Sequence, residues 1–334
     1  MMDIYFESNY GKLCEVIERG HCEVFTHSSS LGIIRHMFIK REIPMSMNGQ
    51  TYYDLITPYG YGGPLILECE NGKENELALE FHERFSQYCR DNYVVSEFVR
   101  FHPIVDNARW FGSCYDVSFV RYTVGTDLER SEDPLMEFSK SCRSRIRKAL
   151  REGVTYRITV EPNNLDSFKR IYYLTMDRNA ASEFYYFEDQ YFEDCLALFR
   201  KNLILVEAVY QNTTIAAGLC FAYGTTLHVH LSGTLPQFLS LSPAYVLRYA
   251  LSLWAKENGF CLIHHGGGRT NDANDNLYRF KKQFGNVFFE FSVGKKIWNE
   301  AIYWRLCAER RVPIGETIDF FPAYRYQLYE NTYR

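Results

Sequence analysis

The sequence predicts an α/β (α+β) fold in two domains, and three observations support this. Its 334 residues are enough for two domains of ordinary size. Segments with apolar residues at helical spacing alternate with short runs rich in β-branched and aromatic residues, which are typical of strands. Three such runs, 203–210, 214–223 and 226–234, are divided by the turn-like pairs QN and GT, which predicts an antiparallel meander.

The first domain is expected at residues 1–135. Apolar residues recur at near-helical spacing over 74–92, which predicts a helix there. The runs 93–101 and 115–124 are then expected to be strands. An α/β pattern follows for this half of the chain.

A loop rich in glycine and proline lies inside this first domain. Residues 57–64, TPYGYGGP, contain three glycines and two prolines, which fix an unusual backbone path. Tyr59 and Tyr61 offer their hydroxyl groups from this loop, so we take both tyrosines as candidate substrate-binding residues.

The second domain is expected at residues 136–334, where helices and strands alternate more regularly. A basic helix over 133–152 ends before Gly153, a typical C-terminal cap. The further expected helices are 163–180, a segment ending near residue 200, 241–259 and 274–285; the further strands are 154–160, the meander, 260–265 and 286–293. Pro243 in the first turn and Gly259 just past the end mark the bounds of the helix over 241–259.

Composition excludes several classes of protein. The formal charge of -4 argues against a general nucleic-acid coat and leaves room only for a local basic surface. The ten cysteines include no C-x-x-C pair, which is typical of reduced thiols and argues against a zinc site. The N-terminal segment is acidic and no apolar run is long enough to span a bilayer, so we expect a cytoplasmic protein, with peripheral membrane contact left open.

The basic helix is the first candidate binding element. Between Lys140 and Arg151 it carries six basic residues and no acidic one, and its apolar residues form a separate ridge. Arg143 and Arg147 lie one turn apart on the basic side, where guanidinium groups suit phosphate oxygens. Two interpretations stay open: a phosphate-binding face, or a charged face that only contacts water.

A second candidate is the connection TMDRNAASEFYYF, over 175–187. Arg178 could contact a phosphate, while Tyr185 and Tyr186 could stack on a base. The same three residues could instead serve only as packing at the rim of the core.

Four histidines form a third candidate set. Alternation along 226–234 places His228 and His230 on the same face of the sheet, and His264 and His265 end a strand that could lie beside it. No metal-binding motif includes them, so we expect no metal. A structural role, acid–base catalysis and substrate contact remain as alternatives, with His230 and His265 as the candidates for catalysis and His228 for binding.

The stretch HHGGGRTND, over 264–272, follows a strand and precedes a helix. Its glycines would let a ligand approach the backbone, the helix N-terminus would present amide groups, and Arg269 is a candidate substrate-binding residue. It matches neither the P-loop nor the dinucleotide-binding pattern. The pattern therefore names no particular ligand.

Taken together and in order, five segments resemble the Fem family of aminoacyltransferases, within the GNAT acetyltransferase superfamily. They are the loop TPYGYGGPL, the basic helix with the following strand, the connection TMDRNAASEFYYF, the helix SPAYVLRYALSLWAKENG, and LIHHGGGRTNDANDNLYRFKKQFG. The resemblance implies two tandem GNAT-like domains with mixed, largely antiparallel sheets. It also implies transfer of an amino acid from aminoacyl-tRNA to an amine of a peptidoglycan precursor.

The resemblance further implies roles for single residues. Lys281 matches the lysine that stabilises the tetrahedral oxyanion and holds the tRNA end, and Arg178 matches an arginine of the phosphate-binding connection. His230 stands where relatives show tyrosine, a departure that bears on the acceptor. No cofactor is expected, because ordered binding and charge stabilisation supply most of what amide formation needs.

The expected function is therefore an amide-forming aminoacyltransferase that acts in cell-wall biogenesis. Its expected partners are the acceptor end of aminoacyl-tRNA and a phosphate-bearing small molecule or cell-wall precursor, but not DNA. One alternative is an N-acyltransferase that uses acyl-CoA on an amino sugar, a polysaccharide precursor or a natural-product amine, although the Q/R-x-x-G-x-G/A signature is missing. Another alternative is a binding protein without catalysis.

Overall fold

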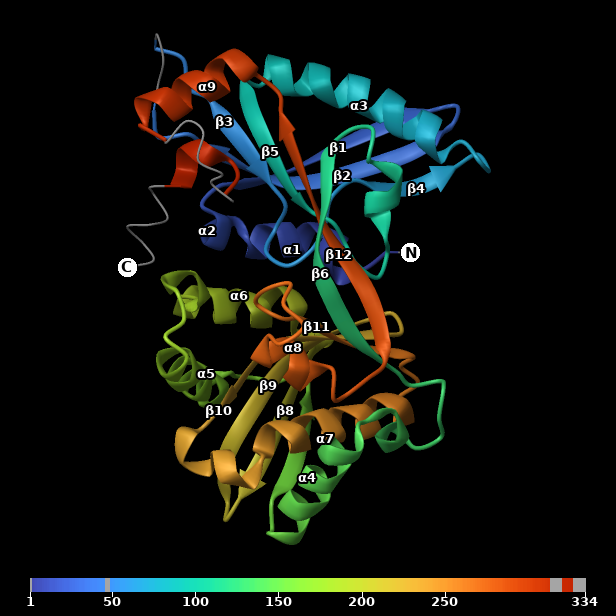
Figure 1. Ribbon diagram of the computed structural model, residues 1–334, viewed down its shortest axis with the longest axis vertical. Helices are drawn as coiled ribbons and strands as arrows, with labels where there is room; N and C mark the ends of the chain where they lie inside the picture. The colour runs from blue at the N-terminus through green and yellow to red at the C-terminus, as the bar shows by residue number, and fades with distance from the viewer. Residues whose placement is uncertain (1, 46–48, 313–319, 327–334) are drawn as a thin grey trace. The chain divides into compact units, whose positions relative to one another are not determined.

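The computed structural model describes residues 2–45, 49–312 and 320–326 (Figure 1). Its contacts divide the chain into two compact units, Met1–Val120 with Glu290–Arg334, and Arg121–Phe289. This division differs from the one expected at residues 135/136. The last part of the chain belongs to the first unit because the strand β12 (Val287–Ile297) pairs with β5 (Val94–Arg100).

The first unit contains a mixed sheet. Its other strands are β1 (His21–Ser29), β2 (Gly32–Glu42), β3 (Tyr53–Ile56) and β4 (Leu65–Cys69). β2 pairs with β1, β3 and β4 in antiparallel fashion, β3 pairs with β5 in parallel, and β5 pairs with β12 in antiparallel fashion.

Two helices cover the faces of this sheet. The long helix α3 (Glu74–Asp91) buries Leu77, Phe81 and Phe85 in an aromatic-rich core that includes Val94. The next residue on β5, Val95, points to the other face and packs with α9 (Glu300–Glu309). The shorter helices of the unit are η1 (Ile4–Phe6), α1 (Ser8–Leu13), α2 (Glu15–Glu18), η2 (Asn107–Trp110) and η7 (Ala323–Arg325).

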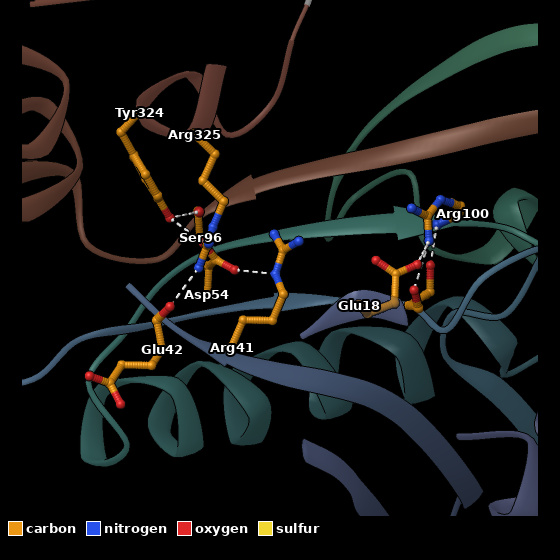
Figure 2. A network of polar contacts seen from close by, with 9 residues as sticks. Glu18, Arg41, Glu42, Asp54, Ser96, Arg100, Tyr324 and Arg325 are labelled. Atoms are coloured by element: carbon orange, nitrogen blue, oxygen red, sulfur yellow. Dashed lines mark hydrogen bonds and ion pairs between the residues drawn. The ribbon is translucent and has the colours of Figure 1, made fainter. Parts of the chain in front are cut away.

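A buried ionic network stabilises the first unit. Figure 2 shows the Asp54 carboxylate between Arg41 and Arg325. The Nε–O distances are 2.7 and 2.5 Å. Tyr324 donates a further hydrogen bond to Asp54. Although burial alone would raise the pKa of Asp54, the two guanidinium groups lower it below its ordinary value. Each buried charge of this network therefore has a partner.

The second unit contains the predicted meander. Strands β7 (Thr155–Val160), β8 (Leu203–Tyr210), β9 (Thr213–Tyr223) and β10 (Thr226–Thr234) pair in antiparallel order. β10 then pairs in parallel with β11 (Leu262–Gly267), which pairs in antiparallel fashion with β6 (Asp116–Asp127). The fold class and the antiparallel meander are confirmed.

Helices cover both faces of the second sheet (Figure 1). The apolar side of α7 (Pro243–Glu257) packs on β7, β8, β9 and β10, and its residues Val246, Leu247 and Leu251 lie in the main core of the unit. The basic helix α4 (Lys140–Arg151) contacts α7. α5 (Asp166–Arg178) packs against β9 and β10, and α6 (Asp189–Phe199) against β8. The short helices are η3 (Pro134–Glu137), η4 (Glu183–Tyr185), η5 (Arg200–Asn202), η6 (Pro236–Leu241) and α8 (Asn276–Lys281).

One helix begins later than predicted. The segment expected to be helical over 133–152 opens with the 3-10 turn η3, and α4 starts only at Lys140. Ser139 has an extended backbone and its hydroxyl accepts from the amide of Cys142, so it acts as the N-terminal cap. Cys142 and Ile146 of α4 then pack with Phe138 and Phe284, which joins α4 to the segment after α8.

In the part of the chain that the structure describes, no helix is long and apolar enough to cross a membrane.

Candidate functional site

Two cations hold the glycine-rich turn that follows β11. Lys281, the last residue of α8, donates from Nζ to the carbonyl of Gly267 at 2.8 Å. Arg121 on β6 donates from one nitrogen to the carbonyls of Gly268 and Arg269, at 2.5 and 2.6 Å. Three successive carbonyl groups of the turn therefore face positive charges.

The amide groups near this turn are engaged by Asp275, the N-terminal cap of α8. Its carboxylate accepts from the amides of Arg269 and Tyr278, at 3.2 and 2.8 Å. A Cβ atom at Gly268 would lie 2.5 Å from Asp275 Oδ1, so only glycine fits there. The chain's own aspartate therefore occupies the amides of Arg269 and Tyr278. The approach of a ligand to the glycine-rich turn stays a prediction.

Arg248 is a site residue that the sequence reasoning missed. It lies within α7 and is only 3% exposed, yet no ion pair joins it to an acidic residue in the described part of the chain. Its Nε is buried without a partner, and burial lowers the pKa of Arg248 from its ordinary value. The available signal was a lone arginine inside the apolar run YVLRYALSL.

Lys281 is electrostatically coupled to Arg248. Burial, followed by the charges of Arg248 and Arg121, lowers the pKa of Lys281 to about 7, while Asp275 has a smaller opposing effect. Lys281 therefore exists in both charged and neutral forms near neutral pH. Such a group can donate a hydrogen bond to a developing oxyanion, and it can also exchange a proton.

His265 lies beside these cations in one defined tautomer. Thr126 donates its hydroxyl proton to the carbonyl of Phe284, so it must accept from His265 Nε2, which is 2.8 Å away. The other ring nitrogen, Nδ1, is then an acceptor, and it is buried without a partner among the described residues. Burial, Arg248 and Lys281 hold the pKa of His265 well below its ordinary value, so the ring is neutral.

The remaining histidines lie on β10 and β11. His228 pairs with His264 across the parallel strands, with 3.4 Å between their Nδ1 atoms, so the expectation that these strands are neighbours is confirmed. His230 accompanies His228 on the face opposite Leu227 and Val229, where it hydrogen-bonds the Tyr191 hydroxyl. Burial, followed by the effect of His228, lowers the pKa of His230 to about 3. The His230 ring is therefore a weak base, and it forms a hydrogen bond with Tyr191.

β10 and β11 pair over only three residues each. The last pair is His228 with His264, although β10 continues to Thr234 and β11 to Gly267. Bulges at Val229/Leu231 and at His264/Gly266 accompany this change. Beyond this point β11 no longer pairs with β10, which leaves a strand edge to which an extended, amide-bearing ligand could bond.

The basic face of α4 lies within the same unit. Arg147 lines a cavity of about 370 Å³ with Ser144, Leu150 and Arg151. Arg143 is partly buried and contacts the sulfur of Met136. No acidic residue is paired with Arg143 or Arg147 among the described residues, so both are available for an anionic partner.

Hydrogen bonds within the second unit hold the connection that contains Arg178 in place. Arg178 donates to the carbonyl of Thr234 at 2.8 Å, and Tyr186 donates to Asp177 at 2.9 Å. Tyr185 is exposed, and its carbonyl accepts from Tyr172. Arg178 therefore already has a structural role at the end of β10, and its contact with phosphate remains a prediction.

Of three further predicted residues, one lies in the glycine-rich turn and two lie in the first unit. Arg269 is exposed and its amide is bound by Asp275. In the first unit, the Tyr61 ring packs 5.2 Å from Tyr5, and the carbonyl of Tyr59 accepts from a neighbouring tyrosine. Of the predicted catalytic residues, Lys281 and His265 are coupled electrostatically to each other and to Arg248, and Lys281 and Arg121 bond neighbouring carbonyl groups of the turn.

Comparison with known proteins places this geometry in a known fold. Residues 136–282 match a family model described as an acetyltransferase (GNAT) domain. The fold is similar to that of FemX, with a TM-score of 0.70 at 12% identity over 91% of this chain and 94% of FemX. No curated protein matches the sequence.

Two further solved structures share the fold. One is the C-terminal DUF2156 domain of an Agrobacterium fabrum protein described as a lysylphosphatidylglycerol synthetase, with a TM-score of 0.56 at 12% identity, covering 88% of this chain and 87% of that one. The other is L-PGS of Bacillus licheniformis, with a TM-score of 0.51 at 12% identity, covering 86% of this chain and 90% of that one. The chain therefore has a Fem-like GNAT fold, as the sequence predicted.

Proposed function

We propose that this protein is an amide-forming acyltransferase that transfers an aminoacyl group from aminoacyl-tRNA to an amine of a cell-wall precursor or related metabolite. The observation that carries the proposal is Lys281, a partly buried lysine that donates to the glycine-rich turn at Gly267 and is electrostatically coupled to the buried Arg248. The likeness in fold to FemX and to L-PGS supports acyl transfer.

In the proposed reaction, the amine nitrogen attacks the carbonyl carbon of the ester. A C–N bond forms, the C–O bond to the ribose breaks, the amine loses a proton and the ribose hydroxyl gains one. Lys281 donates to the oxyanion of the tetrahedral intermediate, which is the point of greatest charge development. No covalent enzyme intermediate is required, because binding and orientation supply much of the rate.

The basic and aromatic residues are assigned to binding. Arg143 and Arg147 contact phosphates of the RNA, which suits their position without acidic partners. Arg178, Tyr185, Tyr186, His228 and Arg269 are assigned to the same substrate, and Tyr59 and Tyr61 to the acceptor. His230 and His265 are neutral, so they act as hydrogen-bonding groups and not as strong bases.

The alternative is an N-acyltransferase that uses acyl-CoA. Two observations favour it: the match of residues 136–282 to the GNAT domain model, and the short pairing of β10 with β11. The amide groups of the CoA arm could bond to β10 beyond the point where its pairing with β11 ends.

A transfer assay distinguishes the two donors. The protein is incubated with labelled aminoacyl-tRNAs or acyl-CoAs and a panel of amines, and new amide product is measured. We expect product with aminoacyl-tRNA; product with acyl-CoA alone would replace the proposal by the alternative. Binding of an acceptor without transfer from any donor would indicate a protein that binds without catalysis.

Lys281→Ala tests the role of the lysine within this assay. We expect turnover to fall about 100-fold or more, as when one oxyanion donor is removed. Lys282→Ala is the matched control, since Lys282 is exposed and its ammonium group lies over the rings of Tyr278 and Phe288. If both variants retain normal turnover, Lys281 does not act on the oxyanion.

A further inference from the structure

The helix α4 carries a row of arginines whose charges have no acidic partner in the described part of the chain. Arg143, Arg147 and Arg151 are spaced by four residues, so they follow one another along one side of the helix, about 6 Å apart along its axis. Arg147 and Arg151 are exposed, and Arg143 is partly buried. None of the three forms an ion pair among the described residues. The row therefore presents unneutralised positive charge along one side of α4.

This arrangement of charge does not stabilise the helix itself. Like charges four residues apart repel each other, and Lys140 and Arg143 lie in the first turn, where the helix dipole favours acidic residues. The helix α3 shows the stabilising arrangement, with Glu74 and Glu76 in its first turn and Arg90 in its last. The basic row of α4 therefore opposes helix formation, and a bound anion would remove that repulsion.

A cavity adjoins the arginine row. It has a volume of about 370 Å³ and is lined by Ser144, Arg147, Leu150 and Arg151. Two guanidinium groups and a hydroxyl group can therefore contact a ligand there, beside one apolar side chain. A volume of this order is typical of small-ligand pockets, whereas a charged face that only contacts water needs no cavity. This observation favours a binding surface over a solvated face.

Of the possible anionic partners, a nucleic-acid strand fits the row best. Neighbouring phosphates of one strand are separated by about the same distance as the arginines, so each guanidinium group can contact the next phosphate. An anionic membrane would require exposed apolar side chains for insertion, but Cys142, Ile146 and Ala149 of α4 are buried. Since the whole chain has a formal charge of -4, a local surface has to supply the attraction.

We infer that α4 binds the sugar–phosphate backbone of an RNA strand, with Arg143, Arg147 and Arg151 on successive phosphates. The cavity beside Arg147 accommodates one sugar–phosphate unit of this strand. The inference deepens the proposed function and rests on it for the kind of nucleic acid, because the proposed donor is an aminoacyl-tRNA. Contacts to phosphates position the RNA and do not read its base sequence.

Fluorescence anisotropy with a labelled RNA hairpin that ends in CCA and carries no amino acid tests the inference. For three phosphate contacts, a plot of log K against log salt should have a slope of about -2 to -3 in the unmodified protein. Arg147→Gln should weaken binding and make this slope shallower by about 1. The triple variant Arg143→Gln, Arg147→Gln, Arg151→Gln should bind the hairpin about tenfold more weakly or worse.

Two controls separate the arginine row from general effects. Arg170→Gln replaces an exposed arginine on α5 of the same unit and should bind the hairpin as the unmodified protein does. The glutamine variants of α4 lose only repulsion between like charges, so thermal unfolding should show them to be at least as stable as the unmodified protein. A second hairpin of different base sequence should bind equally well, and a strong preference for one sequence would contradict backbone contact.

The inference and the proposed function fail separately. Equal RNA affinity in the triple variant and in the unmodified protein overturns the inference, even if aminoacyl transfer is observed. The absence of RNA binding by the unmodified protein does the same, and binding to phosphatidylglycerol vesicles in place of RNA would assign the row to a membrane surface. Loss of RNA binding in the triple variant, with Arg170→Gln unchanged, supports the inference even if no donor yields product.

Discussion

The two units have similar patterns of strand pairing, but their buried charged side chains differ in whether they have a partner of opposite charge. Each has an antiparallel set of strands, one parallel pair and a final antiparallel strand. In the first unit, buried Asp54 contacts both Arg41 and Arg325 (Figure 2). In the second, buried Arg248 has no acidic partner among the described residues.

This difference separates structural charges from functional ones. Asp54 forms ion pairs with residues of its own unit. In the same unit Arg100 forms a second ion pair with Glu18, with an N–O distance of 2.9 Å. Arg248 instead has no ion pair with an acidic side chain among the described residues, and its Nε is buried without a hydrogen-bond partner there. The second unit therefore carries the stronger case for the reactive site, and replacement of the buried charges Asp54 and Arg248 should have opposite effects on stability.

The largest effect is expected for Asp54→Asn. The substitution leaves Arg41 and Arg325 facing each other in the core without a counter-charge, which should lower the free energy of unfolding by about 3–5 kcal/mol. Urea denaturation measures this. Asp189→Asn, which removes an exposed ion pair with Lys169 in the second unit, should cost less than about 1 kcal/mol.

The contribution of Asp54 also depends on pH. Its pKa is lowered in the folded state, so its stabilisation is complete above the unfolded value of about 3.9 and is lost as pH falls through the folded value. The acid sensitivity of unfolding should be smaller in Asp54→Asn. An equal acid sensitivity in the two proteins would contradict the paired-charge interpretation.

Arg248→Met should have the opposite sign. Removal of a buried charge without a partner should raise the free energy of unfolding by about 1–4 kcal/mol in the absence of anions. The same urea experiment measures this gain, with Arg279→Met as the control. A loss of stability similar to that of Asp54→Asn would mean that Arg248 has a structural role like that of the charges in the first unit.

A smaller effect is expected for Lys281→Met. It should change the slope of the free energy of unfolding plotted against pH. The pKa of Lys281 is lowered to about 7, so between that value and about 10.4 the unfolded chain binds more protons than the folded one. Stability should therefore rise with pH above 7, by about 1 kcal/mol per pH unit or less. Lys281→Met should lack this contribution over pH 7–9; an identical slope in both proteins would show that Lys281 is not desolvated.

The smallest expected effects concern helix caps, which should behave alike in both units. Ser139 caps α4 and Asn299 caps α9, each by accepting from a backbone amide. Replacement of either by alanine should cost about 1 kcal/mol, because a cap acts locally. Thermal unfolding compares the two variants, and a much larger loss in one of them would show that the cap also has a tertiary role.

Much of the fold could be predicted from the sequence, because the evidence for it is local. Pro243 and Gly259 mark the bounds of α7, and the turns at 211–212 and 224–225 define the meander. These signals depend on neighbouring residues and on the spacing of apolar side chains. The start of α4 was missed because Pro134 and Ser139 both fit a helix start, and the structure begins the α-helix at the second.

The candidate site depended on contacts between residues far apart in the chain. Lys281 and His265 were identified from the sequence, Lys281 through a family resemblance, but Arg248 and Arg121 were not. A lone arginine in an apolar helix has an ordinary local pattern. Its meaning depends on whether an acidic side chain from another element lies beside it. Local sequence determines the helix, whereas only packing determines the partners of a buried charge, because electrostatic interactions depend on distance in space and on burial.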